Sequence, residues 1–168
     1  MHVLCWIIFI GLCIKTGAIL YSFLVSFFIN PVAAKHLYLV LNLSDLKAFD
    51  EQHYSRMVCL VIALWAFKAY MFYIVIQIFL KINFVQPFSS AMATLIKRIS
   101  YMALAIGLMA VIADGYRQWL SEKNVALSNL QEYTAGGAEF LFFAGIVYII
   151  SLVFKRGIEI QSENELTV

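Results

Sequence analysis

Four ionisable residues lie within long apolar runs, and these residues are the first candidates for chemistry. Lys15 and Lys68 lie near the middle of two runs. Asp114 lies in a third run, and Glu139 lies near one end of a fourth. A charged side chain near the centre of a bilayer costs at least ~2.5–3.5 kcal/mol on insertion scales. Such groups could relay a proton or an ion, bind an anionic ligand, or simply fix the register of the helices that carry them.

The spacing of small residues indicates which of these charges face the protein interior. Lys15 and Asp114 each lie on a helical stripe of small side chains. The stripe of Lys15 also holds Gly11, Ala18, Ser22 and Ser26, and that of Asp114 holds Ala103, Gly107 and Ala110. Small residues let helices approach closely in lipid. We therefore expect Lys15 and Asp114 to face each other as an intramembrane charge pair, directly or through water.

Lys68 and Glu139 have simpler interpretations. Lys68 lies opposite the small and polar stripe of its own segment. It either extends along the apolar surface towards the headgroups, lies on a bulky packed face, or is covered by a second subunit of a homo-oligomer. Glu139 lies where water reaches the membrane surface, so solvation explains it. Trp65 is typical of membrane aromatic residues, and we expect no special role for it.

Patterns typical of catalysis and of cofactor binding are missing from the sequence. There is no Gly-rich phosphate loop, nucleophile elbow or paired-histidine zinc signature. His36 and His53, with Asp45, Asp50 and Glu51, could supply metal ligands, but their spacings match no known site. The net charge of +2 and the lack of a Lys/Arg stripe argue against direct nucleic-acid binding. We therefore expect no catalytic residue, cofactor or metal, and a protein that is not an enzyme.

The elements that must position these residues are membrane-spanning helices. The chain is 63% hydrophobic and 13% charged, against roughly 45–50% and about 25% for a soluble domain. Four stretches have the ~20 apolar residues that a helix needs to cross the hydrocarbon. These stretches cover residues 3–29, 57–80, 99–120 and 135–154. Because lipid offers no hydrogen bonds to the backbone, the sequence predicts an all-α integral membrane bundle of four transmembrane helices in one domain, residues 1–168.

Two points about the first half of the chain stay open. In the connection over residues 32–56, Ser44 could cap a short helix that runs through Phe49, whereas Leu37, Leu39, Leu41 and Leu43 alternate as in a strand or an interfacial stretch. In addition, Val32-Ala33-Ala34 has the small residues of a signal-peptide cleavage site. The preceding apolar run is far longer than a signal peptide needs and contains Lys15, so we favour a retained first span.

The second connection and the charge balance give the remaining expectations. Pro87 interrupts the connection, and Ser89 or Ser90 is expected to cap a helix that continues into the third span. Four spans place both termini on one side of the membrane. The Lys/Arg residues are equally divided between the two sides: Lys81, Lys97, Arg98, Lys155 and Arg156 against Lys35, Lys47, Arg56, Arg117 and Lys123. The first set adjoins span ends, which favours cytoplasmic termini.

The end of the sequence carries a family resemblance. Phe154 is followed by a basic pair, by Gly157 and then by an acidic, Gln-containing stretch that closes on Leu166-Thr167-Val168. This pattern resembles domain-of-unknown-function family 2975, a group of bacterial multi-span membrane proteins, and Pro87-Phe88-Ser89 is a second match. The charged residues that the family usually has around this second motif are replaced here by residues 83–86 and 90–93. The resemblance implies a bacterial cytoplasmic (inner) membrane protein, with no assigned activity. It also implies a gene that often neighbours a small helix-turn-helix regulator.

The acidic stretch suggests a function. Gly157 can end the last helix, and an anionic inner leaflet would repel the residues after it, so we expect a tail that projects into the cytoplasm. The candidate partner-binding residues are Glu159, Gln161, Glu163, Asn164, Glu165, Leu166, Thr167 and Val168. We therefore expect a membrane-anchored interaction or sensing partner of a cytoplasmic regulator, with the lipid bilayer as its other partner. The alternatives are a merely solubilising tail, and a small transporter or channel that uses Lys15 and Asp114.

Overall fold

The computed structural model describes residues 2–29, 34, 37–39, 41–82, 89–127 and 129–165. Its long helices are α1 (His2–Phe28), α3 (Glu51–Lys81), α4 (Ser90–Glu122) and α6 (Gly137–Glu165). Two short helices, α2 (Ser44–Phe49) and α5 (Leu130–Thr134), lie in the connections. Four helical segments, the last of them including α5, are long and apolar enough to cross a membrane. The predicted all-α membrane bundle is therefore confirmed, and each predicted span overlaps one long helix.

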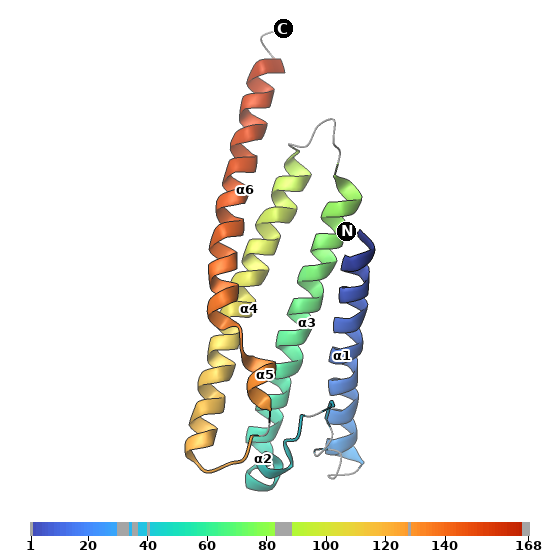
Figure 1. Cartoon of the computed structure of the whole chain (residues 1–168), viewed down its shortest axis with the longest axis vertical. Helices are drawn as coiled ribbons and strands as arrows, with labels where there is room; N and C mark the ends of the chain where they lie inside the picture. The colour runs from blue at the N-terminus through green and yellow to red at the C-terminus, as the bar shows by residue number, and fades with distance from the viewer. Residues whose placement is uncertain are drawn as a thin grey trace.

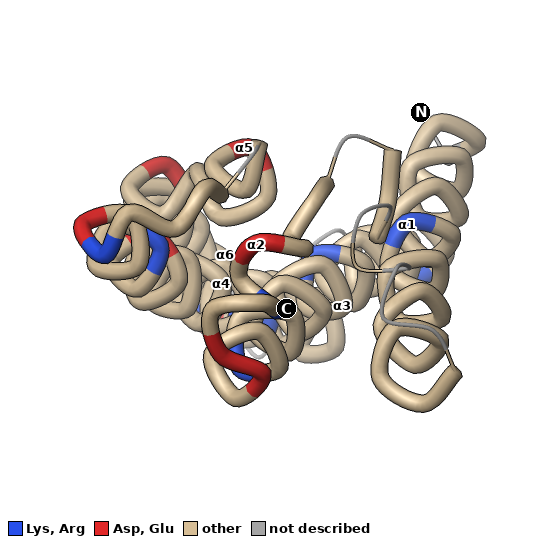
Figure 2. The backbone as a smooth tube through the Cα atoms, turned by 90° about the horizontal axis from the view of Figure 1, so that it is seen from below, with Lys and Arg blue, Asp and Glu red and all other residues tan. Residues whose placement is uncertain are grey.

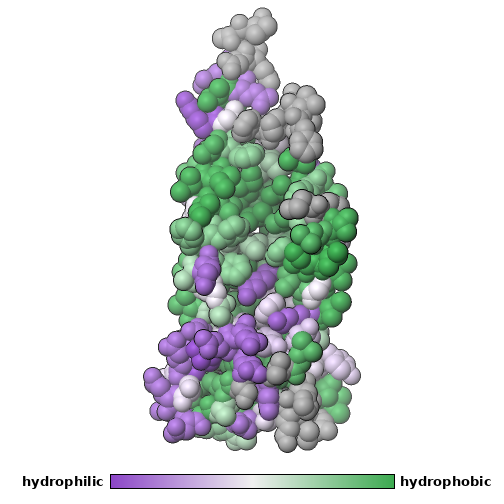
Figure 3. Space-filling view, viewed as in Figure 1, coloured by the Kyte–Doolittle hydropathy of each residue, from purple (hydrophilic) through white to green (hydrophobic). Residues whose placement is uncertain are grey.

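The four long helices form a row. α6 packs on α4, α4 packs on α3, and α3 packs on α1. Both views place α3 between α1 and the α4–α6 pair (Figure 1; Figure 2). The chain begins and ends at the same end of the bundle, whereas α2 and α5 lie at the other end (Figure 1). Hydrophobic residues cover the middle of the molecule, and hydrophilic residues gather at the α2–α5 end and at the projecting end of α6 (Figure 3).

Side-chain caps explain where two of the long helices begin. At α4, the Ser89 hydroxyl accepts a hydrogen bond from the backbone N–H of Met92 at 3.3 Å, as the sequence predicts. At α3, the Asp50 carboxylate accepts from the backbone N–H of His53 at 2.8 Å, so the helix begins well before the predicted span. This bond holds the pKa of the Asp50 carboxyl below its usual value. α2 also begins at Ser44, but the Ser44 side chain does not cap it.

The described part of the connection between α1 and α3 holds a folded loop and α2, and the alternating leucines form no strand there. Tyr38 and Leu41 form an isolated bridge, and Leu39 between them is exposed with φ of +46°. The other described leucines of this segment are buried in a cluster at the α2–α5 end. Its fully buried members include Leu37, Leu41, Leu43, Leu46, Tyr54, Leu120 and Leu130. This cluster ties α1, α2, α3, α4 and α5 together at one end of the bundle.

α4 and α6 approach closely along the stripe of small residues in α4. A Cβ placed on Gly107 would lie 2.8 Å from the Leu141 side chain, and one on Gly137 would lie 2.8 Å from the Val111 side chain. The Ser100 hydroxyl donates a 3.0 Å hydrogen bond to a backbone carbonyl of α6. The small stripe therefore does mark a helix contact, but the helix that it contacts is α6 and not α1.

α6 does not end where the sequence analysis expects. The helix continues through Gly157 to Glu165 and projects beyond the rest of the bundle (Figure 1). Arg156 and Glu159 form an ion pair at 2.8 Å, and the Ser162 hydroxyl donates to the Glu159 carbonyl. A glycine ends a helix when it takes a left-handed conformation, and Gly157 is not among the positive-φ residues. The expected stop at Gly157 is therefore wrong, because the residues after it continue the helical hydrogen-bonding pattern.

Candidate functional site

Lys15 is half-buried among aromatic rings. Its ammonium nitrogen is 3.4 Å from the ring centroid of Trp65, 4.4 Å from that of Tyr133 and 5.6 Å from that of Tyr38. The negative face of an aromatic ring attracts a cation, by ~0.5–2 kcal/mol or more when water is excluded. Three separate parts of the chain, namely α3, α5 and the loop before α2, therefore supply rings to one lysine of α1.

Lys68 shares this environment. Its ammonium nitrogen is 4.6 Å from the Trp65 ring and 5.3 Å from the Phe140 ring. Because Trp65 and Lys68 are three residues apart, they lie on the same side of α3. We call this group the lysine–aromatic cluster; it comprises Lys15, Lys68, Trp65, Tyr38, Tyr133 and Phe140. The cluster gives Lys68 a partner within the chain, which the sequence analysis left open.

In the lysine–aromatic cluster, the ammonium groups of Lys15 and Lys68 lie against the same indole ring, that of Trp65. Neither Lys15 nor Lys68 forms an ion pair in the described part of the chain, although Glu132 of α5 lies near enough to act on Lys15 electrostatically. The Trp65 ring nitrogen is buried there without a hydrogen-bond acceptor. Two ammonium groups in an apolar setting can attract an anion or exchange protons. The sequence signal for this cluster is the Trp65–Lys68 spacing, which the analysis of single stripes overlooked.

The structure does not bring Lys15 and Asp114 together. The Asp114 carboxylate accepts hydrogen bonds from the Arg117 Nε at 2.8 Å and from the Gln118 side chain at 2.9 Å, and it lies 3.5 Å from the Thr134 hydroxyl. The predicted charge pair fails because α3 stands between α1 and α4, whereas Arg117 is one turn away from Asp114 on the same helix. A cavity of about 420 Å³ lies beside Asp114, between α4 and the chain around α5.

The remaining candidates lie near water. Glu139 is exposed in the first turn of α6, where the helix dipole favours an acid. His53 contacts the Tyr116 hydroxyl and packs against the Trp119 ring, and His36 lies outside the described residues. Of the candidate partner-binding residues, Glu159, Gln161 and Glu163 lie on α6, and Glu163 is exposed. The side chains of Asn164, Glu165, Leu166, Thr167 and Val168 lie outside the described residues.

Comparison with known proteins agrees with the resemblance in the sequence. No curated protein and no solved structure matches the chain. Residues 44–168 match the model of a family described as "Protein of unknown function (DUF2975)". The match begins at the first residue of α2 and includes α3, α4, α5 and α6. Since it covers well over half of the sequence, the chain belongs to the DUF2975 family of proteins.

Proposed function

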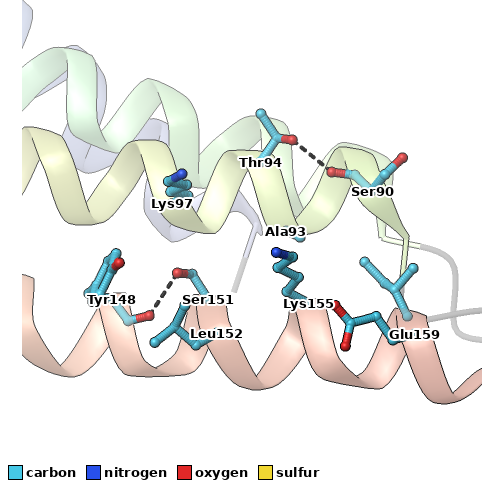
Figure 4. Close-up of a pocket in the computed structure, with 10 residues that line it drawn as sticks. Ser90, Ala93, Thr94, Lys97, Tyr148, Ser151, Leu152, Lys155 and Glu159 are labelled. Carbon is cyan, nitrogen blue, oxygen red and sulfur yellow. Dashed lines mark hydrogen bonds between the residues drawn. The ribbon is translucent and has the colours of Figure 1, made fainter.

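We propose that this membrane protein is an interaction partner of a cytoplasmic regulator, which it holds with the projecting end of α6. The observation that carries the proposal is the continuation of α6 past the start of α4. Ser90, the first residue of α4, lies at the level of Glu159 of α6, and both line one groove (Figure 4). The helix then runs on to Glu165, beyond the end of its neighbour (Figure 1).

The charge of this end supports a protein partner rather than lipid. Glu159, Glu163 and Glu165 are acidic, and no basic residue follows Arg156. An anionic inner leaflet repels such a segment, so contact with lipid does not explain it. Acidic groups instead steer association towards a basic surface. A DNA-binding regulator carries a basic surface, so the helix end could hold the regulator at the membrane and compete with DNA for it.

The helical form of the segment supports the same proposal. A disordered tail loses conformational entropy when it binds, whereas a helix that is already formed presents its side chains with less loss. The Arg156–Glu159 ion pair, at a three-residue spacing, supports the helix along this segment. We infer that both termini lie in the cytoplasm of a bacterial inner membrane. The basic residues Lys81, Lys97-Arg98 and Lys155-Arg156 at this end of the bundle agree with that orientation.

Affinity purification from the native host tests the proposal. The full chain and the variant Glu163→Gln/Glu165→Gln are captured through the same internal tag, and transcripts are compared in parallel. We expect the full chain to recover a DNA-binding protein, and the variant to lose most of it and to change transcription. The matched control is Glu122→Gln/Glu132→Gln, which removes two acids at the opposite end of the bundle. If all three proteins recover the same partners and give equal transcript profiles, the proposal fails.

A small transporter or channel is the second candidate, and the lysine–aromatic cluster favours it. Lys15 and Lys68 place two cations near the middle of apolar helices, which is a setting typical of groups that bind or pass ions. In this candidate Lys15 acts with Lys68 and not with Asp114, since Arg117 occupies the Asp114 carboxylate. Partner binding remains our conclusion, because the cation–aromatic contacts also stabilise both lysines without any transport role.

A further inference from the structure

A groove made of two neighbouring cavities lies along one side of the α4–α6 pair. On α4 its lining residues recur every three or four positions, at Ser90, Thr94, Lys97, Tyr101 and Leu104. On α6 they recur in the same way, at Leu141, Gly145, Tyr148, Leu152 and Lys155. Residues spaced in this way share one side of a helix. The groove consists of two cavities, of about 520 Å³ and about 370 Å³, and Tyr148 lines both.

The two cavities differ in chemistry. The larger one lies at the start of α4, and Lys97 and Lys155 are among the residues that line it (Figure 4). The hydroxyl residues Ser90, Thr94 and Ser151 also line it. The smaller cavity lies deeper along the helices. It is lined by the rings of Tyr101 and Tyr148, by the leucines Leu104 and Leu141, and by small residues of both helices.

Neither lysine forms an ion pair in the described chain, although Glu159 acts electrostatically on Lys155. Glu159 lines the larger cavity, but its carboxylate accepts a hydrogen bond from Arg156 at 2.8 Å. Lys155 points from α6 towards α4 (Figure 4). Lys97 lies over the Tyr101 ring, 5.6 Å from its centroid, and so stands where the basic cavity meets the apolar one. The groove thus has a basic end near the membrane surface and an apolar end within the membrane.

We propose that this groove binds one anionic phospholipid. The phosphate lies between Lys97 and Lys155, and an acyl chain follows the apolar cavity past Leu104 and Leu141. Basic pockets between transmembrane helices on the cytoplasmic side recognise anionic headgroups. A soluble phosphate would use only the basic cavity, whereas a phospholipid uses both. The two cavities lie along the same faces of α4 and α6 and share Tyr148, which favours the lipid. The inference is independent of the partner that α6 holds.

Thermal unfolding of the purified full chain in neutral detergent tests the lipid site, with affinity taken from the shift on titration. The titrants are phosphatidylglycerol, phosphatidylcholine and inorganic phosphate. We expect phosphatidylglycerol to bind most tightly, and Lys97→Gln/Lys155→Gln to weaken it roughly tenfold or more, since each basic residue near a charged surface is worth about a factor of five. The control is Lys81→Gln/Arg98→Gln, which removes two basic residues at the same end but outside the groove lining.

A second variant tests the apolar half. A Cβ on Gly145 meets nothing within 4 Å, so Gly145→Leu can be accommodated and fills the groove. We expect it to weaken binding of the long-chain lipid and to spare a short-chain phosphatidylglycerol. The proposal is overturned if inorganic phosphate stabilises as well as the lipid. It is also overturned if the control pair loses as much affinity as the groove pair, or if Gly145→Leu changes nothing.

Discussion

The two outer helix pairs of the row are held together in different ways. α4 and α6 meet backbone to backbone, and Gly107 and Gly137 lie where a Cβ would come within 2.8 Å of the facing helix. α1 and α3 meet less closely. A Cβ on Gly11 or Gly17 of α1 would meet nothing within 4 Å, and a cavity of about 270 Å³ lies between α1 and α3. Around Lys15, aromatic rings fill the space between the helices instead.

This difference shows what a stripe of small residues can and cannot predict. Both α1 and α4 carry such a stripe, but only the stripe of α4 faces a helix that approaches closely. In α1 the long side chain of Lys15 interrupts the stripe, and the bulky Trp65 ring lies opposite it. A cation in an apolar segment is then stabilised by ring faces rather than by an acid. The α1–α3 pair should therefore tolerate added volume at its glycines, and the α4–α6 pair should not.

Gly107→Ala tests this difference with the largest expected effect. The new methyl group would clash with the side chain and backbone of Leu141, and overpacking of this kind costs about 1–3 kcal/mol. Gly115→Ala in the same helix is the control, because a Cβ there meets nothing within 4 Å. Both substitutions gain the same helix propensity, so their difference in thermal unfolding in detergent isolates the packing term. Equal stability of the two variants would contradict the close α4–α6 contact.

A smaller effect is expected from the lysine–aromatic cluster. Trp65→Leu should destabilise the protein more when Lys15 is present than in a Lys15→Met background. In that background the attraction between the cation and the ring is already absent, so Trp65→Leu cannot remove it. The expected coupling is about 1–2 kcal/mol. Thermal unfolding of the wild type, the two single variants and the double variant measures it. Trp119→Leu, whose ring stacks on Tyr116 instead, should be additive with Lys15→Met. Additivity at Trp65 as well would mean that the ring does not stabilise Lys15.

Features set by short stretches of sequence could be predicted, and features set by the order of the helices could not. Apolar runs predict the four long helices, and Ser89 predicts the start of α4. The expected pairing of Asp114 with Lys15 depends on which helix lies beside α4, and a stripe does not identify its neighbour. The observed partner, Arg117, lies three residues further along α4, a local spacing that the stripes did not reveal. The contacts of Lys15 depend on Tyr38 and Tyr133, which are far apart in sequence and belong to segments with no strong pattern.

Gly157 of α6 is a local sequence signal that is compatible with two outcomes, the end of a helix or its continuation. Gly157 has the freedom to end a helix, but it also continues one when the flanking residues support the helical conformation. The Arg156–Glu159 pair spans this glycine at the three-residue spacing that stabilises helices. The expected end of the helix rested on the glycine alone, whereas the ion pair across it favours continuation.

Cysteine accessibility at the two ends of the bundle tests most directly whether α6 projects into the cytoplasm. Ser162→Cys on α6 and Asn129→Cys beside α5 are made in a background without Cys5, Cys13 and Cys59. Intact cells are treated with a membrane-impermeant maleimide. We predict labelling at position 129 in intact cells, and labelling at position 162 only after the membrane is permeabilised. Labelling of position 162 from outside intact cells would contradict the orientation, and with it the proposed cytoplasmic partner.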